Sequence, residues 1–368
     1  MGLAVGILGL ANVGKSTTFN ALCKAQAAQA ANYPFCTIEP NIAQVEVPDL
    51  RLNELSKIVK PQRLQYSTVD FTDIAGLVRG ASRGEGLGNQ FLSHIKECEV
   101  LLHVVRCFED SNITHTEGSV DSLRDAELIN TELILADISA CERKIERLAR
   151  QAKSDKQAAQ ELELAKALLA YLGDGNKAQG FAATLTEAQS PIWQGFNQEM
   201  RFLSAKEMIY AANVDEEGLS LDNDHVKALR EYIENAPLIK LCARLEEELI
   251  GLDDAEALEL LSSFGMKESA LSLIIKESFA RLGLISYFTA GVKEVRAWTI
   301  TKGDKAPRAA SVIHKDFEKG FIRAEVISYE DFIAHNGEAG AKAAGKMRLE
   351  GKDYVVNDGD LMHFRFAL

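Results

Sequence analysis

Short apolar runs and helix-like stretches follow one another through the first third of the chain. Residues 3–8 form an apolar run, which leads through a glycine-containing loop into a helix-like stretch beginning at Ser16. Residues 68–73 alternate between apolar and polar side chains, and residues 100–105 form another apolar run. Runs of this length beside turn residues indicate strands of a sheet. The pattern therefore predicts an α/β domain in this part of the chain.

The pattern changes to helical spacing between residues 121 and 173. Apolar or small residues recur there at intervals of three and four, in two stretches on either side of Ser154-Asp-Lys-Gln157. This spacing places them on one face of a helix, and the Ser-x-x-Gln sequence predicts a capping box between two helices. We therefore expect an antiparallel helical hairpin of about 40 Å per arm. Its charged outer faces are either solvated or form a surface for a partner.

A third pattern begins at about Tyr287, where short β-type runs surround two helix-like stretches. The runs cover residues 295–300, 321–327, 354–356 and 362–366, and the helix-like stretches cover residues 309–315 and 331–335. Turn sequences containing glycine separate them at residues 302–304 and 357–360. This arrangement predicts a small α+β domain of the β-grasp type at the C-terminal end.

Composition and charge limit the possible partners. The 368 residues are 46% hydrophobic, so we expect two or three domains with cores of their own. The formal charge of −13 should repel nucleic acid, and contact with RNA would need a locally basic patch. The C-terminal part offers one, in which basic residues are interleaved with aromatic ones, although such charged runs also occur on simply solvated surfaces. These residues are Lys315, Lys319, Arg323, Lys342, Lys346, Arg348 and Lys352, with Phe317, Phe321 and Tyr354.

The cysteines and the apolar runs indicate a cellular compartment. Six cysteines are scattered without a C-x-x-C pair, which argues against a disulfide framework or a zinc site and favours reduced thiols. No apolar run reaches the length of a membrane span, and the apolar N-terminus lacks a basic leader. We therefore expect a cytoplasmic protein without a membrane partner.

The loop from Gly9 to Ser16 carries the most specific chemistry in the chain. Its sequence fits the pattern G-x-x-x-x-G-K-S and lies between the predicted first strand and the following helix. In such loops the glycines let backbone N–H groups point at phosphates, the lysine, here Lys15, reaches the terminal phosphates, and the Ser16 hydroxyl ligates Mg²⁺. The alternative is a plain glycine turn between strand and helix. We expect the loop to bind a nucleoside triphosphate.

Two further segments are candidates for switches that respond to the terminal phosphate. Asp73 ends the alternating run at 68–73 and begins the sequence Asp-x-x-Gly76, so its carboxylate would hold Mg²⁺ through water and the Gly76 N–H would sense the phosphate. Thr37 lies in a loop bounded by prolines and would complete the Mg²⁺ ligands, unless it is an ordinary turn residue. The glycine-rich residues 84–88 follow directly, as expected of a segment that orders when triphosphate binds.

Base recognition should involve the residues after two later strands. The run 208–212 leads into Asn213-Val-Asp-Glu216, where ordinary GTPases have Asn-Lys-x-Asp. With Val214 in place of the lysine and Glu216 in place of the aspartate, the usual pairing with guanine is lost, so we favour adenine. A further strand ends at Cys242 and Ala243, whose backbone would contact the base, although a buried strand end is an equal alternative.

The residue that would orient the attacking water is not obvious. Many related enzymes place a glutamine directly after Gly76, and this chain has Leu77, which cannot orient water. His115, in the polar loop 110–118, is the candidate for this role, although a loop histidine is more often solvated. His94 is weaker because a packed position in a helix explains it. We expect slow intrinsic hydrolysis.

Several motifs together resemble the YchF family of Obg-like P-loop ATPases, over the whole chain. They are Asn12-Val-Gly-Lys-Ser-Thr17, Asn32-Tyr-Pro-Phe-Cys-Thr37-Ile-Glu-Pro-Asn41, Asp73-Ile-Ala-Gly-Leu-Val78, Gly84-Glu-Gly-Leu-Gly-Asn-Gln-Phe91, Asn213-Val-Asp-Glu216 and Tyr287-Phe-Thr-Ala-Gly-Val-Lys-Glu-Val-Arg-Ala-Trp298. The resemblance implies a Ras-like P-loop domain with an inserted coiled-coil hairpin and a C-terminal ubiquitin-like TGS domain. It also implies ATP preferred over GTP and association with ribosomes.

The resemblance also assigns roles and boundaries. It implies that residues Asn12, Val13, Gly14, Lys15, Ser16 and Thr17 bind phosphates, that Ser16 and Thr37 bind Mg²⁺, and that Asp73 belongs to the switch. It gives residues 213–216 to the base and matches Leu77 to the family's hydrophobic replacement of the glutamine. We expect the nucleotide domain at residues 1–120 and 200–280, the hairpin at 121–199 and the TGS domain at 281–368.

Two alternative functions stay open beside a slow ATPase that acts on the ribosome. One is a binding module that senses adenine nucleotide and rarely hydrolyses it, and Leu77 fits that equally well. The other is a GTPase of the translation-factor type, which Val214 and Glu216 oppose. We expect a monomer that contacts the ribosome, and its RNA, through the hairpin and the TGS domain.

Overall fold

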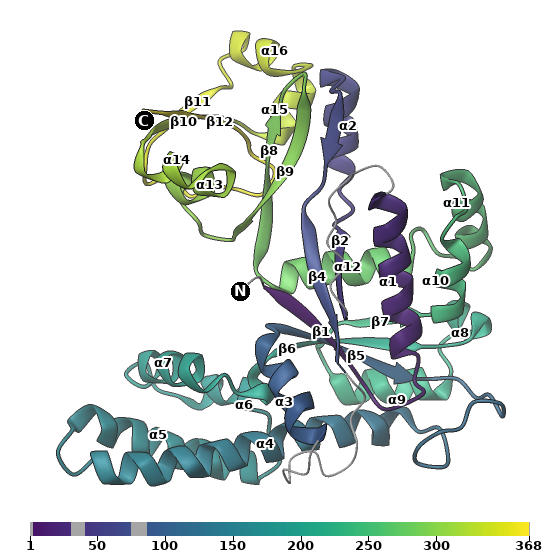
Figure 1. Ribbon diagram of the computed structural model, residues 1–368, viewed down its shortest axis with the longest axis vertical. Coiled ribbons are helices and arrows are strands. Elements are labelled where there is room, and N and C mark those ends of the chain that lie inside the picture. Colours follow the sequence, from purple (N-terminus) through teal and green to yellow (C-terminus); the bar gives the residue numbers. More distant parts are fainter. Residues whose placement is uncertain (1–2, 31–40, 75–86, 368) are drawn as a thin grey trace. The chain divides into compact units, whose positions relative to one another are not determined.

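The computed structural model describes residues 3–30, 41–74 and 87–367, which form two compact units (Figure 1). Unit 1 comprises Met1–Ala43 and Asp70–Ile274, and unit 2 comprises Gln44–Val69 and Ile275–Leu368. The chain therefore passes from unit 1 into unit 2 within β2 (Ile42–Glu46) and returns within β4 (Thr68–Asp73). It enters unit 2 again within α12 (Ala270–Arg281).

Unit 1 is built on a six-stranded sheet with the order β2-β4-β1-β5-β6-β7. The five strands from β4 to β7 in this order are parallel to one another. β5 is buried at every position, as expected of a parallel strand with both faces covered. The predicted strands are confirmed as β1 (Ala4–Leu8), β4, β5 (Val100–Arg106), β6 (Glu207–Asn213) and β7 (Leu238–Leu241). Their carboxyl ends share one edge of the sheet, which is where open α/β sheets bind ligands.

Helices follow most of these strands in unit 1. The first, α1, begins at Lys15, directly after the glycine-containing loop, and α9 begins behind a cap in which Asn223 accepts the N–H of Val226 at 2.9 Å. Outside the hairpin, the helices of this part of unit 1 are α1 (Lys15–Ala30), α3 (Leu87–Glu97), α8 (Glu216–Ser220), α9 (Asp224–Ile233), α10 (Ala243–Leu249) and α11 (Asp254–Ser263).

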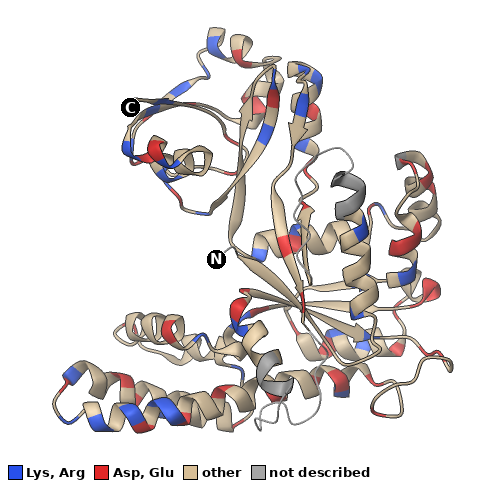
Figure 2. Cartoon of the chain, viewed as in Figure 1, with Lys and Arg blue, Asp and Glu red and all other residues tan. Residues whose placement is uncertain are grey.

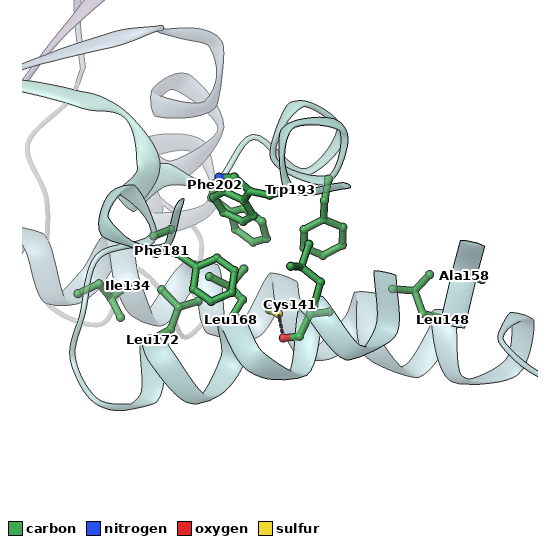
Figure 3. Packing of buried hydrophobic residues seen from close by; sticks show 13 residues of the cluster. Ile134, Cys141, Leu148, Ala158, Leu168, Leu172, Phe181, Trp193 and Phe202 are labelled. Carbon is green, nitrogen blue, oxygen red and sulfur yellow. Dashed lines mark hydrogen bonds between the residues drawn. The ribbon is translucent and has the colours of Figure 1, made fainter. Parts of the chain in front are cut away.

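The predicted helical hairpin consists of α4 (Ser122–Gln151) and α5 (Lys156–Gly173), which pack against each other. Figure 1 shows α4 beginning beside α9 and running out into the hairpin. The outer part has its own core, in which Cys141, Leu148 and Leu168 of the hairpin pack with Trp193 and Phe202 from the segment that follows (Figure 3). That segment includes α6 (Ala178–Phe181), η2 (Ala182–Thr184), α7 (Ser190–Met200) and η3 (Leu203–Ala205).

Two details of the hairpin differ from the sequence-based prediction. The capping box at Ser154 is wrong, because α5 is capped one residue later by Asp155, which accepts the N–H groups of Gln157 and Ala158. A carboxylate is the stronger acceptor at this position, and the Ser154 hydroxyl instead lies near the Gln151 carbonyl. With 18 residues, α5 spans only about 27 Å, which is shorter than the arm we expected.

Unit 2 is built on a second six-stranded sheet with the order β11-β10-β12-β8-β9-β3. It mixes antiparallel pairs with the parallel pairs β12–β8 and β3–β9. Its strands are β3 (Arg63–Gln65), β8 (Leu284–Ala290), β9 (Glu294–Thr301), β10 (Phe321–Ile327), β11 (Arg348–Glu350) and β12 (Leu361–Phe366). Its helices are α2 (Leu50–Val59), α13 (Ala306–Ile313), α14 (Lys315–Lys319), α15 (Tyr329–Ala334) and α16 (Glu338–Ala343).

The sequence missed part of unit 2. The prediction of a strand at residues 354–356 is wrong, because the only pairing there is an isolated bridge between Val355 and Lys305. Residues 44–69 also join unit 2, although the expected boundaries gave them to the nucleotide domain. They do so because β3 pairs with β9 and because Leu52 of α2 is buried in one core with Phe288. The hairpin is counted with unit 1.

None of the helices in the described part of the chain is long and apolar enough to cross a membrane. The five cysteines in that part are free thiols, and all except Cys23 are buried.

Candidate functional site

The loop between β1 and α1 adopts a conformation that needs glycine at two positions. Gly9 and Gly14 have φ angles of 151° and 103°. A Cβ atom on Gly9 would lie 2.4 Å from the carbonyl oxygen of Val104, and one on Gly14 would lie 2.2 Å from Nδ2 of Asn213. Any side chain would therefore collide with β5 or β6. This close packing fixes the loop at the N-terminus of α1, where unpaired N–H groups and the helix dipole attract anions.

Lys15 is the cation of this loop and is largely buried, with 8% of its surface exposed. Its Nζ donates to the carbonyl of Leu10 at 2.5 Å. Burial lowers the pKa of Lys15, and the nearby carboxylate of Asp73 partly opposes that shift. A buried ammonium group in such surroundings gains from a second anion, which the phosphates of a nucleotide would supply.

Asp73 ends β4 beside β1, with which it pairs at Ile7. Its Oδ1 atom is buried and has no hydrogen-bond partner in the described part of the chain. Burial raises the pKa of Asp73, and Lys15 partly opposes that shift. Together with the exposed Ser16 in the first turn of α1, this carboxylate fits Mg²⁺, which takes one or two protein oxygens and completes its shell with water and phosphate.

The residues described contain no cluster of three His, Cys, Asp or Glu side chains suited to a metal ion. A magnesium site of the kind expected beside a phosphate loop does not need such a cluster, because the nucleotide provides part of the ligand shell. Thr37, Gly76 and Leu77 lie outside the described residues, so their predicted roles are carried forward as proposals.

A cavity of about 560 Å³ adjoins the phosphate loop. It is bounded by the loop, by the turn after β6, by the turn after β7 and by the segment after β5. Its lining residues are Asn12, Gly14, Thr17, Phe108, Glu109, Asp110, Ile113, Asn213, Val214, Asp215, Glu216, Glu217, Cys242, Ala243 and Arg244. The structure thus brings predicted residues of the phosphate loop, of the turn after β6 and of the turn after β7 around one cavity, with a volume suited to a small ligand.

The remaining predicted residues of the loop lie outside this lining. Val13 is only 1% exposed, and its side chain packs beside Gly9, so its side chain has a packing role. Lys15, Ser16 and Asp73 lie at the phosphate end of the site described above.

Cys242 lines the cavity but is buried, and burial raises the pKa of its thiol. The side chain therefore acts here as a small apolar group.

Asn213 connects three segments that bound the cavity. Its Nδ2 donates to the carbonyl of Val13 at 2.9 Å, and its Oδ1 accepts the N–H of Ala243 at 3.2 Å. Both polar ends of the side chain are therefore engaged by the protein. Asn213 holds the phosphate loop and the β7 turn at a fixed separation, which is a positioning role, and its contact with the base stays a prediction.

The turn after β6 continues into α8, whose N-cap is Asp215. The Asp215 carboxylate accepts the N–H of Gly218 at 2.9 Å and is occupied by the helix. Val214 is buried to 2% exposure and packs against Gly218. Glu216 begins α8 and is exposed at the cavity, which leaves its carboxylate available to a ligand.

The segment after β5 forms a wall of the cavity that the sequence did not reveal. Arg106, fully buried at the end of β5, donates to the carbonyls of Phe108 at 3.1 Å, Asp110 at 3.1 Å and Ile113 at 3.0 Å. Its guanidinium group also lies over the Phe108 ring. A charged residue ending an apolar strand was the available signal, because a buried guanidinium needs several acceptors.

The same segment is tied to the phosphate loop and to α9. Asn12 donates its side-chain amide to the carbonyl of Thr114 at 3.1 Å. Asn223, the cap of α9, donates to the carbonyl of Cys107 at 2.7 Å. The wall therefore has a fixed place beside the loop, and its shape depends on three side chains from different elements.

His115 is buried in this segment and does not line the cavity. Its Nδ1 accepts the N–H of Glu117 at 3.1 Å, so Nε2 carries the proton that is donated to Asp125 at 2.8 Å. Both ring nitrogens are thus engaged, and neither is free to orient a water molecule in this arrangement. His94 lies in α3, as we expected, but it is exposed there, so the expectation that packing explains it is wrong.

Two family models and several relatives match this chain. Residues 4–137 match the family MMR_HSR1, described as "50S ribosome-binding GTPase", and residues 284–367 match YchF-GTPase_C, described as "Protein of unknown function (DUF933)". The chain is 53% identical to "Ribosome-binding ATPase YchF" of Haemophilus influenzae, covering 100% of this chain and 99% of that protein. It is 50% identical to the protein of the same name from Bacillus subtilis, covering 100% of both.

A solved structure is similar over nearly the same length. It is the "Structure of the Schizosaccharomyces pombe YchF GTPase", with a TM-score of 0.87 and 37% sequence identity. The similarity covers 99% of this chain and 97% of that one. Both units therefore have counterparts in a protein of known structure.

Proposed function

The chain belongs to the YchF family, and on that premise we propose that it binds and slowly hydrolyses ATP with Mg²⁺ while associating with the ribosome. The observation that carries the proposal is Asn213, which joins the phosphate loop to the β7 turn around one cavity. Hydrogen bonds to both segments set the distance between a phosphate site and a base site, and a bound nucleotide would span that distance. The proposed reaction is hydrolysis of the terminal phosphate.

At the phosphate end the proposed roles follow from charge. Lys15 and the N–H groups at the start of α1 bind the β- and γ-phosphates. Ser16, Asp73 and Thr37 are proposed to hold Mg²⁺, which when bound neutralises charge that develops between the phosphates. Lys15 would turn from the Leu10 carbonyl toward the nucleotide, because a phosphate is the stronger acceptor. The Gly76 N–H is proposed to sense the terminal phosphate.

At the base end we propose a preference for adenine. The cavity offers carboxylates at Glu109, Asp110 and Glu216, together with the aromatic ring of Phe108. Carboxylates and backbone carbonyls accept hydrogen bonds from the adenine amino group, and the ring gives the base an apolar face to pack against. The names of the relatives differ on this point, since the bacterial proteins are called ATPases and the yeast protein a GTPase.

Slow turnover is proposed for two reasons. Leu77 cannot orient a water molecule, and His115 donates to Asp125 instead. If His115 takes part in hydrolysis, its segment must first rearrange, which would need a bound partner. The alternative of an adenine-nucleotide sensor that rarely hydrolyses fits the same two facts.

The finer architecture and the setting are also proposals. We propose that unit 1 is Ras-like, that the α4–α5 hairpin is a coiled-coil insertion, and that the C-terminal part of unit 2 is a ubiquitin-like TGS domain. The relatives called ribosome-binding support a ribosomal partner in the cytoplasm. The protein would work there as a monomer.

Equilibrium binding of ATP and of GTP, each with Mg²⁺, is the first test. Tighter binding of ATP would support the adenine preference, and hydrolysis measured with and without ribosomes would then separate an enzyme from a sensor. Tighter binding of GTP would overturn the base assignment and favour the GTPase alternative. Failure to bind either nucleotide would refute the proposed function.

A further inference from the structure

Strands β8 and β12 of unit 2 are paired over only a short part of their length. They are parallel neighbours in the sheet, and their pairing places Leu361 opposite Phe288. Beyond that pair β12 continues to Phe366 and β8 to Ala290, and no further pairing joins them in the described part of the chain. The other edge of β12 stays paired with β10 as far as Phe321 and Phe366. Inside the sheet, β12 therefore has an unpaired backbone edge beyond Leu361.

A cavity of about 910 Å³ opens where the two strands separate. It is lined by residues 289–294, which form the end of β8 and the turn to β9, and by residues of β10 and β12. The lining also includes Phe317, from the core on the α13 side of the sheet, and Phe332, from the core on the α2 side. The cavity therefore reaches both faces of the sheet.

Large apolar side chains stay in solvent around this cavity. Val292 is 71% exposed, Ile322 is 56% exposed and Phe366 is 37% exposed, and all three line the cavity. Proteins usually shield an unpaired strand edge, because another extended chain can pair with it. An open edge beside exposed apolar side chains is the arrangement that adds a peptide as a further strand.

The α13 face of the cavity is apolar. Successive side chains of a strand point to opposite faces, and Phe364 lies in the core on the α13 side, so Phe366 points to that face too. Its ring stacks on Phe317 with the centroids 3.8 Å apart. Ile313 lines the cavity beside the same core. This face suits apolar side chains of a bound chain.

The opposite face carries cations. Arg365 and Arg323 lie directly opposite each other in the β10–β12 pairing, and like charges in such a position repel. Arg365 pairs with Glu325 at 3.2 Å. Arg323 is exposed and has no hydrogen-bond or ion-pair partner in the stretches 3–30, 41–74 and 87–367, and the same holds for Lys293 in the β8–β9 turn. An anion bound beside the two arginines would relieve their repulsion.

Most carboxylates of the lining are already compensated. Glu325 pairs with Arg365, and Glu294 pairs with Arg63, which leaves Glu338 without an ion pair among the described residues. Figure 2 shows both blue and red segments in this unit. Attraction of an anion therefore depends on the particular cations at the cavity and not on the overall charge of the unit.

We propose that this cavity binds an extended peptide in which acidic and apolar residues alternate. The peptide pairs its main chain with the free edge of β12 and directs its carboxylates to Arg323 and Arg365, because arginine binds carboxylates through two parallel hydrogen bonds. Its apolar side chains lie against Phe317 and Phe366. RNA fits less well, since its backbone has no N–H groups for a strand edge and no apolar side chains for the α13 face.

The inference goes beyond the proposed function, because it requires neither nucleotide nor ribosome. An array of short peptides that alternate Glu with Val, Leu, Ile or Phe is tested against the full-length protein, and the strongest binder is measured by fluorescence anisotropy. Control peptides replace Glu with Lys, place all the acidic residues in one block, or carry N-methyl groups at every second residue. Only the alternating acidic peptide should bind well. Failure of every alternating peptide, or equal binding by any control peptide, would overturn the inference.

The protein is tested with Arg323→Gln, and Arg308→Gln on α13 is the matched control, since Arg308 is exposed and its side chain contacts only Ser311. Arg323→Gln should weaken peptide binding about tenfold, as expected for the loss of a hydrogen bond to a charged group, and the control should match the wild type. Nucleotide affinity should be unchanged in both. Equal peptide binding by Arg323→Gln and wild type contradicts the proposed site.

Two further measurements complete the test. The melting temperature reports on folding, and if Arg323→Gln misfolds, Lys293→Gln in the β8–β9 turn replaces it with the same expected direction. A single-stranded RNA is measured in parallel against the same proteins. RNA binding that depends on Arg323, without binding of any alternating peptide, would overturn the inference and assign the cavity to nucleic acid.

Discussion

The side-chain amide of Asn213 donates to the carbonyl of Val13 at 2.9 Å, across 200 positions of sequence. The same side chain accepts the N–H of Ala243, so one residue at the end of β6 fixes the phosphate loop and the β7 turn together. A Cβ on Gly14 would lie 2.2 Å from this amide, which shows how tightly the loop is packed against it. The phosphate loop and the residues that line the cavity are therefore held in one fixed arrangement.

Changing Asn213 to Asp should weaken ATP and GTP binding together, by at least about tenfold. The carboxylate would face the Val13 carbonyl without a proton to donate, and an unpaired buried group costs about 1–3 kcal/mol. Isothermal titration of both nucleotides measures the effect. An altered ratio of ATP to GTP affinity would instead mean that Asn213 reads the base.

Gly14→Ala should abolish tight nucleotide binding, because the added Cβ displaces the Asn213 amide. Gly175→Ala is the matched control, since Gly175 also has a positive φ, of 85°, but has no atom within 4 Å of its Cβ position. The control should lose about 1–2 kcal/mol of stability from backbone strain alone and keep its nucleotide affinity. Similar nucleotide affinities in the two variants would show that the Cβ added at Gly14 does not displace the Asn213 amide.

Arg106→Lys should raise the KM for ATP by about tenfold and leave kcat nearly unchanged. Lysine keeps the charge but cannot donate to three carbonyls in the fixed planar geometry of the guanidinium, so the wall at Phe108 loosens. Steady-state kinetics measure the split, and Arg147→Lys, at an exposed arginine of α4 that pairs with Glu199, serves as the control. A fall in kcat at unchanged KM would show that Arg106 acts on the chemical step.

Asp73→Asn should raise the melting temperature of the protein without nucleotide and abolish the extra stabilisation by Mg²⁺ when ATP is bound. Burial raises the pKa of Asp73, so its ionised form is costly in the folded protein, and a neutral amide removes that cost. The amide is also a poor Mg²⁺ ligand. Thermal unfolding without nucleotide tests the first effect, and unfolding with ATP plus Mg²⁺ or plus EDTA tests the second. A Mg²⁺ response like that of the wild type would exclude Asp73 as a ligand.

Glu246 should make the protein less stable as pH rises toward neutrality. It is buried behind the β7 turn, accepts the N–H of Ala270 at 2.7 Å, and has its pKa raised by burial to about 7. The folded protein then keeps a proton that the unfolded chain loses at about pH 4.3. Its contribution to stability is full below about pH 4.3 and is lost as pH rises through about 7.

Glu246→Gln removes this dependence while keeping an oxygen to cap α12. Between about pH 5 and pH 8 the wild type should lose up to about 3 kcal/mol relative to the variant. Urea unfolding of both proteins at several pH values gives the difference. A constant difference across this range would mean that Glu246 does not titrate there.

Local patterns in the sequence were enough to predict much of unit 1. The strands and the phosphate loop follow from spacing, because a buried parallel strand requires an apolar run and a phosphate loop requires glycines at fixed positions. The helical hairpin follows from intervals of three and four. Asp73 ends β4, and Ser16 lies in the first turn of the helix after the loop, as their places in the sequence predicted.

Contacts between distant segments were decided only by the tertiary structure. Residues 44–69 join unit 2 because β3 finds its partner in β9, more than 200 positions away. The positioning role of Asn213, the wall held by Arg106 and the pairing of His115 with Asp125 likewise depend on which segments meet. Spacing and propensity act within a few residues of the chain, whereas a buried polar side chain takes whichever partner packing brings within hydrogen-bond distance. The sequence by itself therefore determined the elements and predicted a phosphate loop, and the packing of those elements determined which side chains face the cavity and which hold other segments in place.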